Sequence, residues 1–127
     1  MYKIQFFISK NGKSQVLNYI NKLKTKTDKS SRIKLSKIQD CINYLKANGS
    51  QVKEPYAKHL YRDIWELRPL RDRILYAYYD NNCFVLLHLF QKDTQKTPKR
   101  EIQQALANLD EYKKRGRDHE KRKKSSN

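Results

Sequence analysis

The hydrophobic positions near the amino terminus change from strand-like to helical spacing. Residues 2–8 (YKIQFFI) alternate aromatic or β-branched residues with polar ones, which predicts a strand that ends before Asn11-Gly12. Apolar residues then recur at helical spacing in two segments, separated by the polar stretch 25–31. The two stripes contain Val16, Leu17, Ile20 and Leu23, then Leu35, Ile38, Ile42 and Leu45. Gly49 stands at the end of the second helix, and we expect the two helices to form an antiparallel hairpin.

After Pro55 the period of the pattern changes towards two. Residues 60–68, 73–79 and 83–92 are three strand candidates with short connections between them, which require antiparallel neighbours. The run CFVLLHLF is apolar at nearly every position, so we expect the third strand to be central and covered on both faces. Thr97 and Pro98 then fit the N-cap and the first position of a last helix. Its inward stripe contains Ile102, Ala105, Leu109 and Tyr112.

The predicted order is β-α-α-β-β-β-α, which indicates an α+β domain. Its antiparallel sheet carries a helical hairpin on one face and is followed by a C-terminal helix. A length of 127 residues is typical of one domain, which we place at residues 1–114. Residues 115–127 (RGRDHEKRKKSSN) contain no apolar side chain, so we expect a frayed helix end or a disordered basic tail.

The net charge narrows the choice of partner. The chain has 29 Lys and Arg residues against 13 Asp and Glu, a formal net charge of +16. Such a field attracts polyanions and accelerates their association, and nucleic acid is the polyanion that we expect. No stretch approaches the roughly 20 apolar residues of a spanning helix, so we expect no membrane partner. Residues 1–8 lack a signal-peptide pattern, which favours a cytoplasmic protein.

The sequence predicts neither a metal nor a cofactor. Cys41 and Cys83 lie inside apolar patterns and form no Cys-x-x-Cys motif, so we interpret them as buried free thiols. His59, His88 and His119 lack the spacing of metal ligands.

The second half of the chain contains four short motifs, each of which occurs once. They are Trp65-Glu66-Leu67-Arg68, Arg73-Ile74-Leu75-Tyr76, Leu89-Phe90-Gln91-Lys92 and Lys96-Thr97-Pro98, the last before a helix with Ala105 near its middle. With them the chain resembles the HigB-type toxins of the RelE/ParE superfamily, a phage-derived host-inhibition-like family. Members of this family often carry two lysines at the end of the last strand. Here Asp93 takes the second position, and Lys96 is the candidate substitute.

This resemblance implies a RelE-like fold and a type II toxin. Such a toxin is a ribosome-associated, metal-independent endoribonuclease that cuts mRNA and thereby inhibits translation and growth. The resemblance also implies a cognate HigA-like antitoxin with a helix-turn-helix, through which alone the toxin would reach operator DNA.

The candidate catalytic residues follow from the chemistry of RNA cleavage by its own 2′-hydroxyl. That reaction needs a base for the hydroxyl, a cation for the phosphorane and an acid for the leaving oxygen. Adjacent strands could bring Arg68, Arg73 and Lys92 around one phosphate. We expect Arg73 to clamp the transition state, and Arg73→Ala to abolish cleavage with little loss of stability. Arg68 either positions the phosphate or shifts the pKa of a neighbour, or else it forms an ion pair with a nearby acid such as Glu66 or Asp72.

The general base is less well defined by the pattern. His88 alternates in phase with Phe84, Leu86 and Phe90, which favours a histidine in the core or at its edge over a catalytic one. Glu66 and His59 are the other candidates.

Lysines and aromatic residues are the candidate RNA contacts. We predict that Lys92 and Lys96 bind RNA, and that Tyr76 and Tyr78, if one ring is exposed, stack on a base. The alternative for these aromatic residues, as for Trp65, is packing in the core.

Two other functions fit the same residues. A ParE-like toxin of this fold would inhibit a topoisomerase by binding alone, and fold does not distinguish it from a nuclease. A non-enzymatic RNA- or DNA-binding protein would use only its charge.

Overall fold

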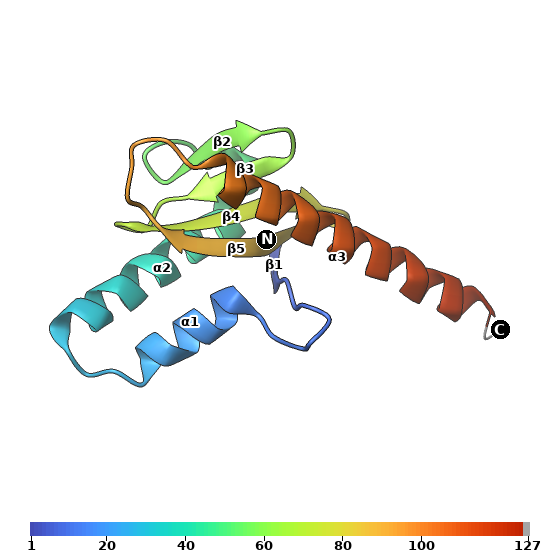
Figure 1. The fold of residues 1–127 in the computed structure, drawn as a ribbon, viewed down its shortest axis with the longest axis horizontal. Helices are drawn as coiled ribbons and strands as arrows, with labels where there is room; N and C mark the ends of the chain where they lie inside the picture. The colour runs from blue at the N-terminus through green and yellow to red at the C-terminus, as the bar shows by residue number, and fades with distance from the viewer. Residues whose placement is uncertain (126–127) are drawn as a thin grey trace.

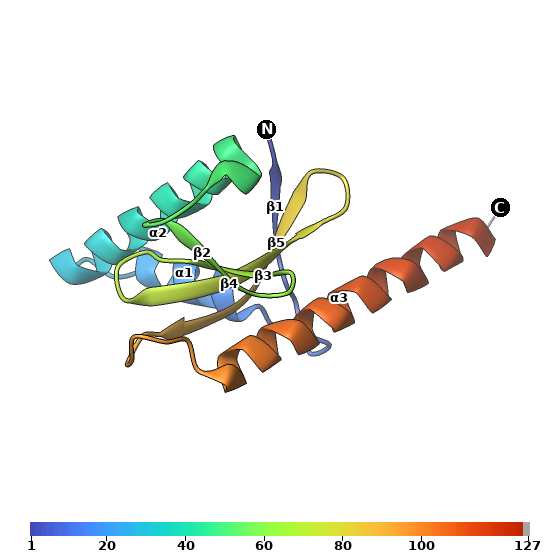
Figure 2. The same ribbon diagram turned by 90° about the horizontal axis from the view of Figure 1, so that it is seen from above.

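The structure, a computed structural model, describes the backbone of residues 1–125 and the side chains of residues 1–116. A five-stranded sheet lies between a helical hairpin and a long C-terminal helix (Figure 1). Seen from above, α1 and α2 cover one face of the sheet and α3 crosses the other (Figure 2). In chain order the elements are β1 (Lys3–Phe6), α1 (Gln15–Lys24), α2 (Lys29–Asn48), a 3₁₀ turn (Gly49–Gln51), β2 (Ala57–Tyr61), β3 (Ile64–Leu67), β4 (Asp72–Tyr79), β5 (Cys83–Gln91) and α3 (Lys99–Ser125).

The α+β class predicted from the sequence is confirmed, but the sheet is mixed. Its strand order is β1-β5-β4-β3-β2, and β1 pairs with β5 in parallel while every other pair is antiparallel. The helical hairpin between β1 and the later strands is long enough to carry the chain back for a parallel pairing. β5 therefore lies inside the sheet with both faces covered, as its apolar run predicted.

The predicted strand 60–68 is in fact a hairpin. β2 and β3 pair antiparallel, and Tyr61 stands opposite Ile64 across the turn Arg62-Asp63. Arg62 has a φ of 49°, in the left-handed region that Gly or Asn normally occupies in such turns. The element order is therefore β-α-α-β-β-β-β-α, and the hairpin escaped prediction because the turn carries neither of those residues.

Each face of the sheet has its own hydrophobic core. On the face covered by the helical hairpin of α1 and α2, which we call the hairpin face, Ile38 and Leu45 of α2 pack with Ile74 and Leu86 of the sheet. On the α3 face, the apolar strand residues pack against the inward stripe of the last helix. This second cluster includes Leu75, Ala77, Val85, Leu87, Ala105 and Leu109.

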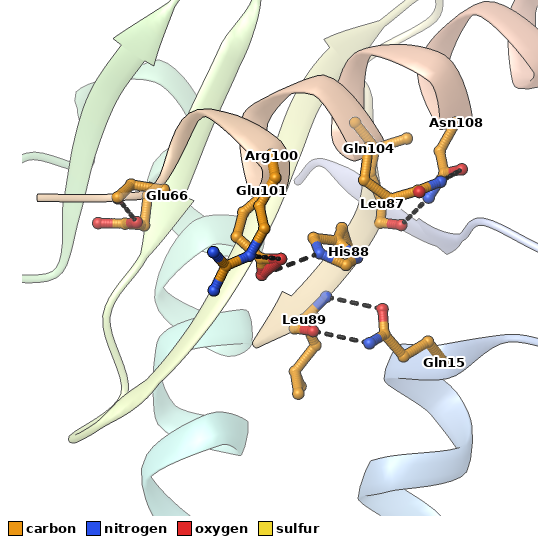
Figure 3. A network of polar contacts seen from close by, with 10 residues as sticks. Gln15, Glu66, Leu87, His88, Leu89, Arg100, Glu101, Gln104 and Asn108 are labelled. Carbon is orange, nitrogen blue, oxygen red and sulfur yellow. Dashed lines mark hydrogen bonds and ion pairs between the residues drawn. The ribbon is translucent and has the colours of Figure 1, made fainter. Parts of the chain in front are cut away.

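A β-bulge in β5 overturns the predicted phase of His88. Leu75 pairs with His88 but Tyr76 pairs with Leu86, so Leu87 has no partner on β4. Leu87 and His88 consequently both face α3, and His88 no longer shares a face with Leu86. Asn108 of α3 donates its amide to the Leu87 carbonyl at 2.8 Å, which satisfies the backbone group that the bulge leaves unpaired (Figure 3).

A side chain continues the sheet where β1 ends. The Gln15 amide of α1 donates to the Leu89 carbonyl at 2.7 Å and accepts from the Leu89 N–H at 3.0 Å (Figure 3). It thus satisfies both backbone groups of a β5 residue that lies beyond Phe6, the last residue of β1.

The remaining sequence predictions concern the cysteines and the chain end. Cys41 and Cys83 are buried free thiols, as predicted, and burial raises the pKa of both. The predicted disorder of residues 115–127 falls largely outside the residues whose side chains are described, and stays a prediction. Within the described part of the chain, no helix is both long and apolar enough to cross a membrane.

Candidate functional site

A cleft of about 380 Å³ opens where the ends of β4 and β5 meet the start of α3. We call it the β5–α3 cleft. Its size lies in the range of small-molecule and cofactor sites, but its walls carry many charges. The charged residues that line it are Glu66, Arg73, Lys92, Asp93, Lys96, Arg100 and Glu101. Cations outnumber acids among them, so the cleft favours an anionic ligand.

Arg73 lies at the base of this cleft and is held from several sides. Its side chain is 9% exposed, and Nη1 donates to the carbonyls of Leu70 at 2.7 Å and Asp72 at 2.9 Å. Leu70 has a φ of 57°, a left-handed conformation that costs strain in a non-glycine residue. Burial lowers the pKa of the Arg73 guanidinium from its ordinary value, while the neighbouring Glu66 opposes that shift.

Glu66 is the acid that contacts both Arg68 and Arg73. Its side chain is 1% exposed, and Oε1 lies 3.1 Å from Nε of Arg68 and 3.8 Å from Nε of Arg73. The other oxygen, Oε2, accepts a hydrogen bond of 2.5 Å from the Thr97 hydroxyl. All three partners come from different segments of the chain, so Glu66 fixes the two guanidinium groups relative to the start of α3.

The strand ends bring Arg73 and Lys92 to the β5–α3 cleft, whereas Arg68 does not line it and lies against Glu66. Arg68 directly follows β3, Arg73 lies in β4, and Lys92 directly follows β5. The backbone N–H of Lys92 donates to the Arg71 carbonyl at 2.8 Å, which extends the β4–β5 pairing to the rim of the cleft. Lys92 is half-buried and Lys96 is exposed, and both line the cleft.

His88 and Glu101 form a pair on the α3 side of the cleft. His88 Nε2 lies 3.3 Å from Glu101 Oε2, with side chains 12% and 16% exposed (Figure 3). Glu101 lines the cleft, whereas His88 lies behind it. Arg100 Nε is 3.9 Å from the other Glu101 oxygen. A carboxylate held in this way can accept a proton from a ligand in the cleft.

Three of the sequence candidates lie elsewhere. His59 is exposed on β2, where Nε2 contacts the Arg62 carbonyl at 2.6 Å. Tyr76 is 2% exposed and belongs to the core on the face covered by α1 and α2, which agrees with the alternative of core packing. Tyr78 is 51% exposed, but it also lies away from the β5–α3 cleft.

The structure also corrects two expectations about single residues. Thr97 does not cap α3, because its hydroxyl is directed to Glu66 and the helix begins at Lys99. The Arg73 side chain is buried and hydrogen-bonded, so Arg73→Ala must cost stability as well as any activity.

Sequence reasoning missed Glu101 and Arg100 as members of the site. Both lie in the first turn of α3, and only the chain reversal after β5 brings that turn over the strand ends (Figure 1). Glu101 carried one available signal, since it is the only acidic residue in that turn. Among the described residues, no group of three or more His, Cys, Asp or Glu side chains could hold a metal ion.

The model of the family described as phage derived protein Gp49-like (DUF891) matches residues 33–110. The matched segment begins within α2 and ends within α3, so it contains every residue that lines the β5–α3 cleft. No curated protein has a significant match to the chain.

Proposed function

Because the chain belongs to the Gp49-like family of phage-derived proteins, within the RelE/HigB-like toxin group, we propose that it is a toxin that cleaves RNA in the β5–α3 cleft. The target that we propose is mRNA on the ribosome. Its loss would stop translation and growth until a cognate antitoxin, HigA-like with a helix-turn-helix, silences the toxin.

One observation carries this proposal: four cations line a single cleft beside the carboxylate of Glu101. They are Arg73, Lys92, Lys96 and Arg100, and Glu66 holds a fifth cation, Arg68, beside Arg73. Fixed donors of this kind stabilise charge that develops on a phosphorane, because they need not reorganise during the reaction. The two carbonyls bind Nη1 of Arg73. In this proposal Nη2 binds a phosphate oxygen.

Glu101 is the best placed general base. Glu66 is fully buried and its two oxygens already bind Arg68 and Thr97, so it positions cations and has no free oxygen for a substrate. Glu101 is more exposed, lines the cleft and is supported from behind by His88. It would take the proton of the 2′-hydroxyl as that oxygen attacks phosphorus.

The rest of the reaction balances with groups in the cleft. The bond between phosphorus and the 5′-oxygen breaks, and a lysine ammonium at the rim gives the leaving oxygen its proton. The products are a 2′,3′-cyclic phosphate and a 5′-hydroxyl, and no co-reactant is consumed. Lys92 and Lys96 are the two lysines at that position.

A cleavage assay on translating ribosomes tests the proposal, with Arg71→Ala as a control for Arg73→Ala. Arg71 lies just before β4 and is exposed, and within the described residues the one hydrogen bond of its side chain is that from Nη2 to the Lys92 carbonyl at 3.3 Å. We expect Arg73→Ala and Glu101→Gln each to lower the cleavage rate at least about 10²-fold, and Arg71→Ala to retain most of it. Primer extension after brief induction would map the cuts.

The outcomes separate the competing functions. Growth arrest without any RNA cleavage would favour the hypothesis of a ParE-like toxin, which inhibits a topoisomerase by binding it. Normal growth with verified accumulation of folded protein would contradict the toxin assignment altogether.

A further inference from the structure

A second pocket lies on the opposite face of the sheet from the β5–α3 cleft. It has a volume of about 320 Å³ and is lined by the aromatic side chains of Tyr2, Trp65, Tyr76, Tyr78 and Phe84, which we call the aromatic pocket. Tyr76 and Phe84 belong to the core cluster that packs on α1 and α2, whereas Arg73 faces α3. The two cavities share no lining residue.

The rings of the aromatic pocket hold one another in place. Phe84 is the centre, with the ring centroids of Tyr2 at 5.3 Å, Tyr76 at 5.8 Å and Tyr78 at 5.3 Å. The Tyr2 ring lies directly over Gly49, where a β-carbon would approach it to 2.2 Å. Gly49 also has a φ of 56°, so only glycine permits this arrangement. The walls are therefore preorganised.

The Tyr76 hydroxyl gives this pocket a polar group. Tyr76 is 2% exposed and lines the pocket. Burial raises the pKa of Tyr76 far above its usual value, so the hydroxyl stays protonated and can donate. Ser50 and Asn82 add exposed polar groups at the rim.

Tyr78 gives the pocket an accessible wall. It is 51% exposed, and its hydroxyl accepts a hydrogen bond from the Asn82 N–H at 3.3 Å. Backbone hydrogen bonds fix two other lining residues, Tyr2 and Asn82. The Tyr2 N–H donates to the Lys46 carbonyl at 2.9 Å, and the Lys3 N–H donates to the Asn82 carbonyl at 2.8 Å.

We propose that the aromatic pocket binds one unpaired base of RNA, at a subsite separate from the cleavage cleft. A base offers flat faces for the tyrosine and tryptophan rings and an edge with acceptors for the Tyr76 hydroxyl. The net charge of +16 favours this ligand over an apolar side chain of a partner protein. The inference rests on the proposed function, because it takes RNA as the ligand.

Trp65 supplies the probe for the test, since it is the only tryptophan of the chain and lines the pocket. The wild-type protein is titrated with a short single-stranded 2′-O-methyl oligonucleotide, which cannot be cleaved by its own 2′-hydroxyl. We expect saturable quenching of Trp65 fluorescence. An abasic oligonucleotide of the same length and charge should bind more weakly and quench little.

Tyr78→Ala is the diagnostic variant, and Tyr61→Ala is its matched control. Tyr61 is 45% exposed, close to the 51% of Tyr78, but lies on β2 outside the pocket. We expect Tyr78→Ala to raise the Kd at least about fivefold, which corresponds to about 1 kcal/mol, with Tyr78→Phe restoring the affinity. Tyr61→Ala should bind like the wild type. Thermal melts of all three variants show whether each is folded.

The proposal fails if the abasic oligonucleotide quenches equally, if Tyr78→Ala and Tyr61→Ala behave alike, or if quenching appears only on addition of a protein partner. Because the probe is not cleaved and Tyr78 lies outside the cleft, the two proposals fail separately. Loss of quenching with intact cleavage removes only the base subsite. Base-dependent quenching without cleavage by the wild type removes only the nuclease.

Discussion

Thr97 donates its hydroxyl to Glu66 across 31 positions of the chain, in a hydrogen bond of 2.5 Å. The bond ties the connection between β5 and α3 to a carboxylate that also contacts Arg68. It therefore couples the position of the first turn of α3, where Glu101 lies, to the arginines at the strand ends. The buried Glu66 carboxylate thus links the two sides of the β5–α3 cleft.

We first predict that Thr97→Val destabilises the protein by about 1–3 kcal/mol. Valine keeps the shape of threonine but leaves one oxygen of the buried Glu66 carboxylate without its donor. Urea unfolding followed by circular dichroism measures the loss. Thr94→Val is the control, because the Thr94 hydroxyl contacts only the Lys96 carbonyl at an exposed site, and it should change stability by less than about 0.5 kcal/mol. Equal losses would show that Glu66 does not depend on Thr97.

The second prediction concerns the stability of Arg73 variants. Arg73→Ala removes a buried guanidinium that contacts Glu66 and two carbonyls, so we expect a loss of about 2–4 kcal/mol. The double variant with Glu66→Gln should lose less than the sum of the two single losses, because the charges compensate each other. A full double-mutant cycle in urea measures this coupling, and simple additivity would argue against the Glu66–Arg73 contact.

A third prediction tests the bulge that turns His88 towards α3. Asn108→Ala leaves the Leu87 carbonyl without its side-chain donor, which should cost about 1–2 kcal/mol. If the bulge positions His88 behind Glu101, the cleavage rate of the folded variant should fall about 10- to 100-fold. Gln103→Ala, an exposed change on the same helix, is the control for both measurements. Full activity in Asn108→Ala would show that the bulge survives without Asn108.

A fourth prediction concerns Gln15, which acts as a strand residue from a helix. Gln15→Ala removes two hydrogen bonds to the Leu89 backbone, and we expect a loss of about 1–2 kcal/mol despite the better helix propensity of alanine. Gln39→Ala, at an exposed position of α2, is the control and should be neutral or slightly stabilising. Amide hydrogen exchange at Leu89 would show the loss locally, and unchanged protection there would contradict the role of Gln15.

The last prediction concerns salt and the chain end. Arg115 donates to the Ile8 carbonyl and lies over the Phe7 ring at 5.3 Å, so a truncation should follow Gly116 and keep this contact. Removing residues 117–127 should flatten the decline of RNA affinity with salt, because fewer phosphates are neutralised. The melting temperature should stay nearly constant. The cations removed include Arg117, Lys121, Arg122, Lys123 and Lys124. An unchanged salt slope would mean that residues 117–127 do not contact RNA.

Periodicity by itself determined the α+β class, the two N-terminal helices and the buried strand β5, and the net charge supplied the prediction of a polyanionic ligand. These features are local or additive, since the side-chain spacing of a segment reports which of its faces is buried. The lengths of the predicted strands and connections also placed Arg68, Arg73 and Lys92 at the ends of neighbouring strands, because a short connection returns each strand beside the previous one.

Only the tertiary structure decided the parallel β1–β5 pair, the bulge at Leu87, the burial of Arg73 around Glu66, and the recruitment of Glu101. Each of these depends on a hydrogen-bond partner far away in the chain. A periodic pattern records that a residue is buried, but not which distant backbone or carboxylate satisfies its polar groups. The same reason hid the aromatic pocket, whose walls meet only when Tyr2 reaches Gly49 and Phe84 across the sheet.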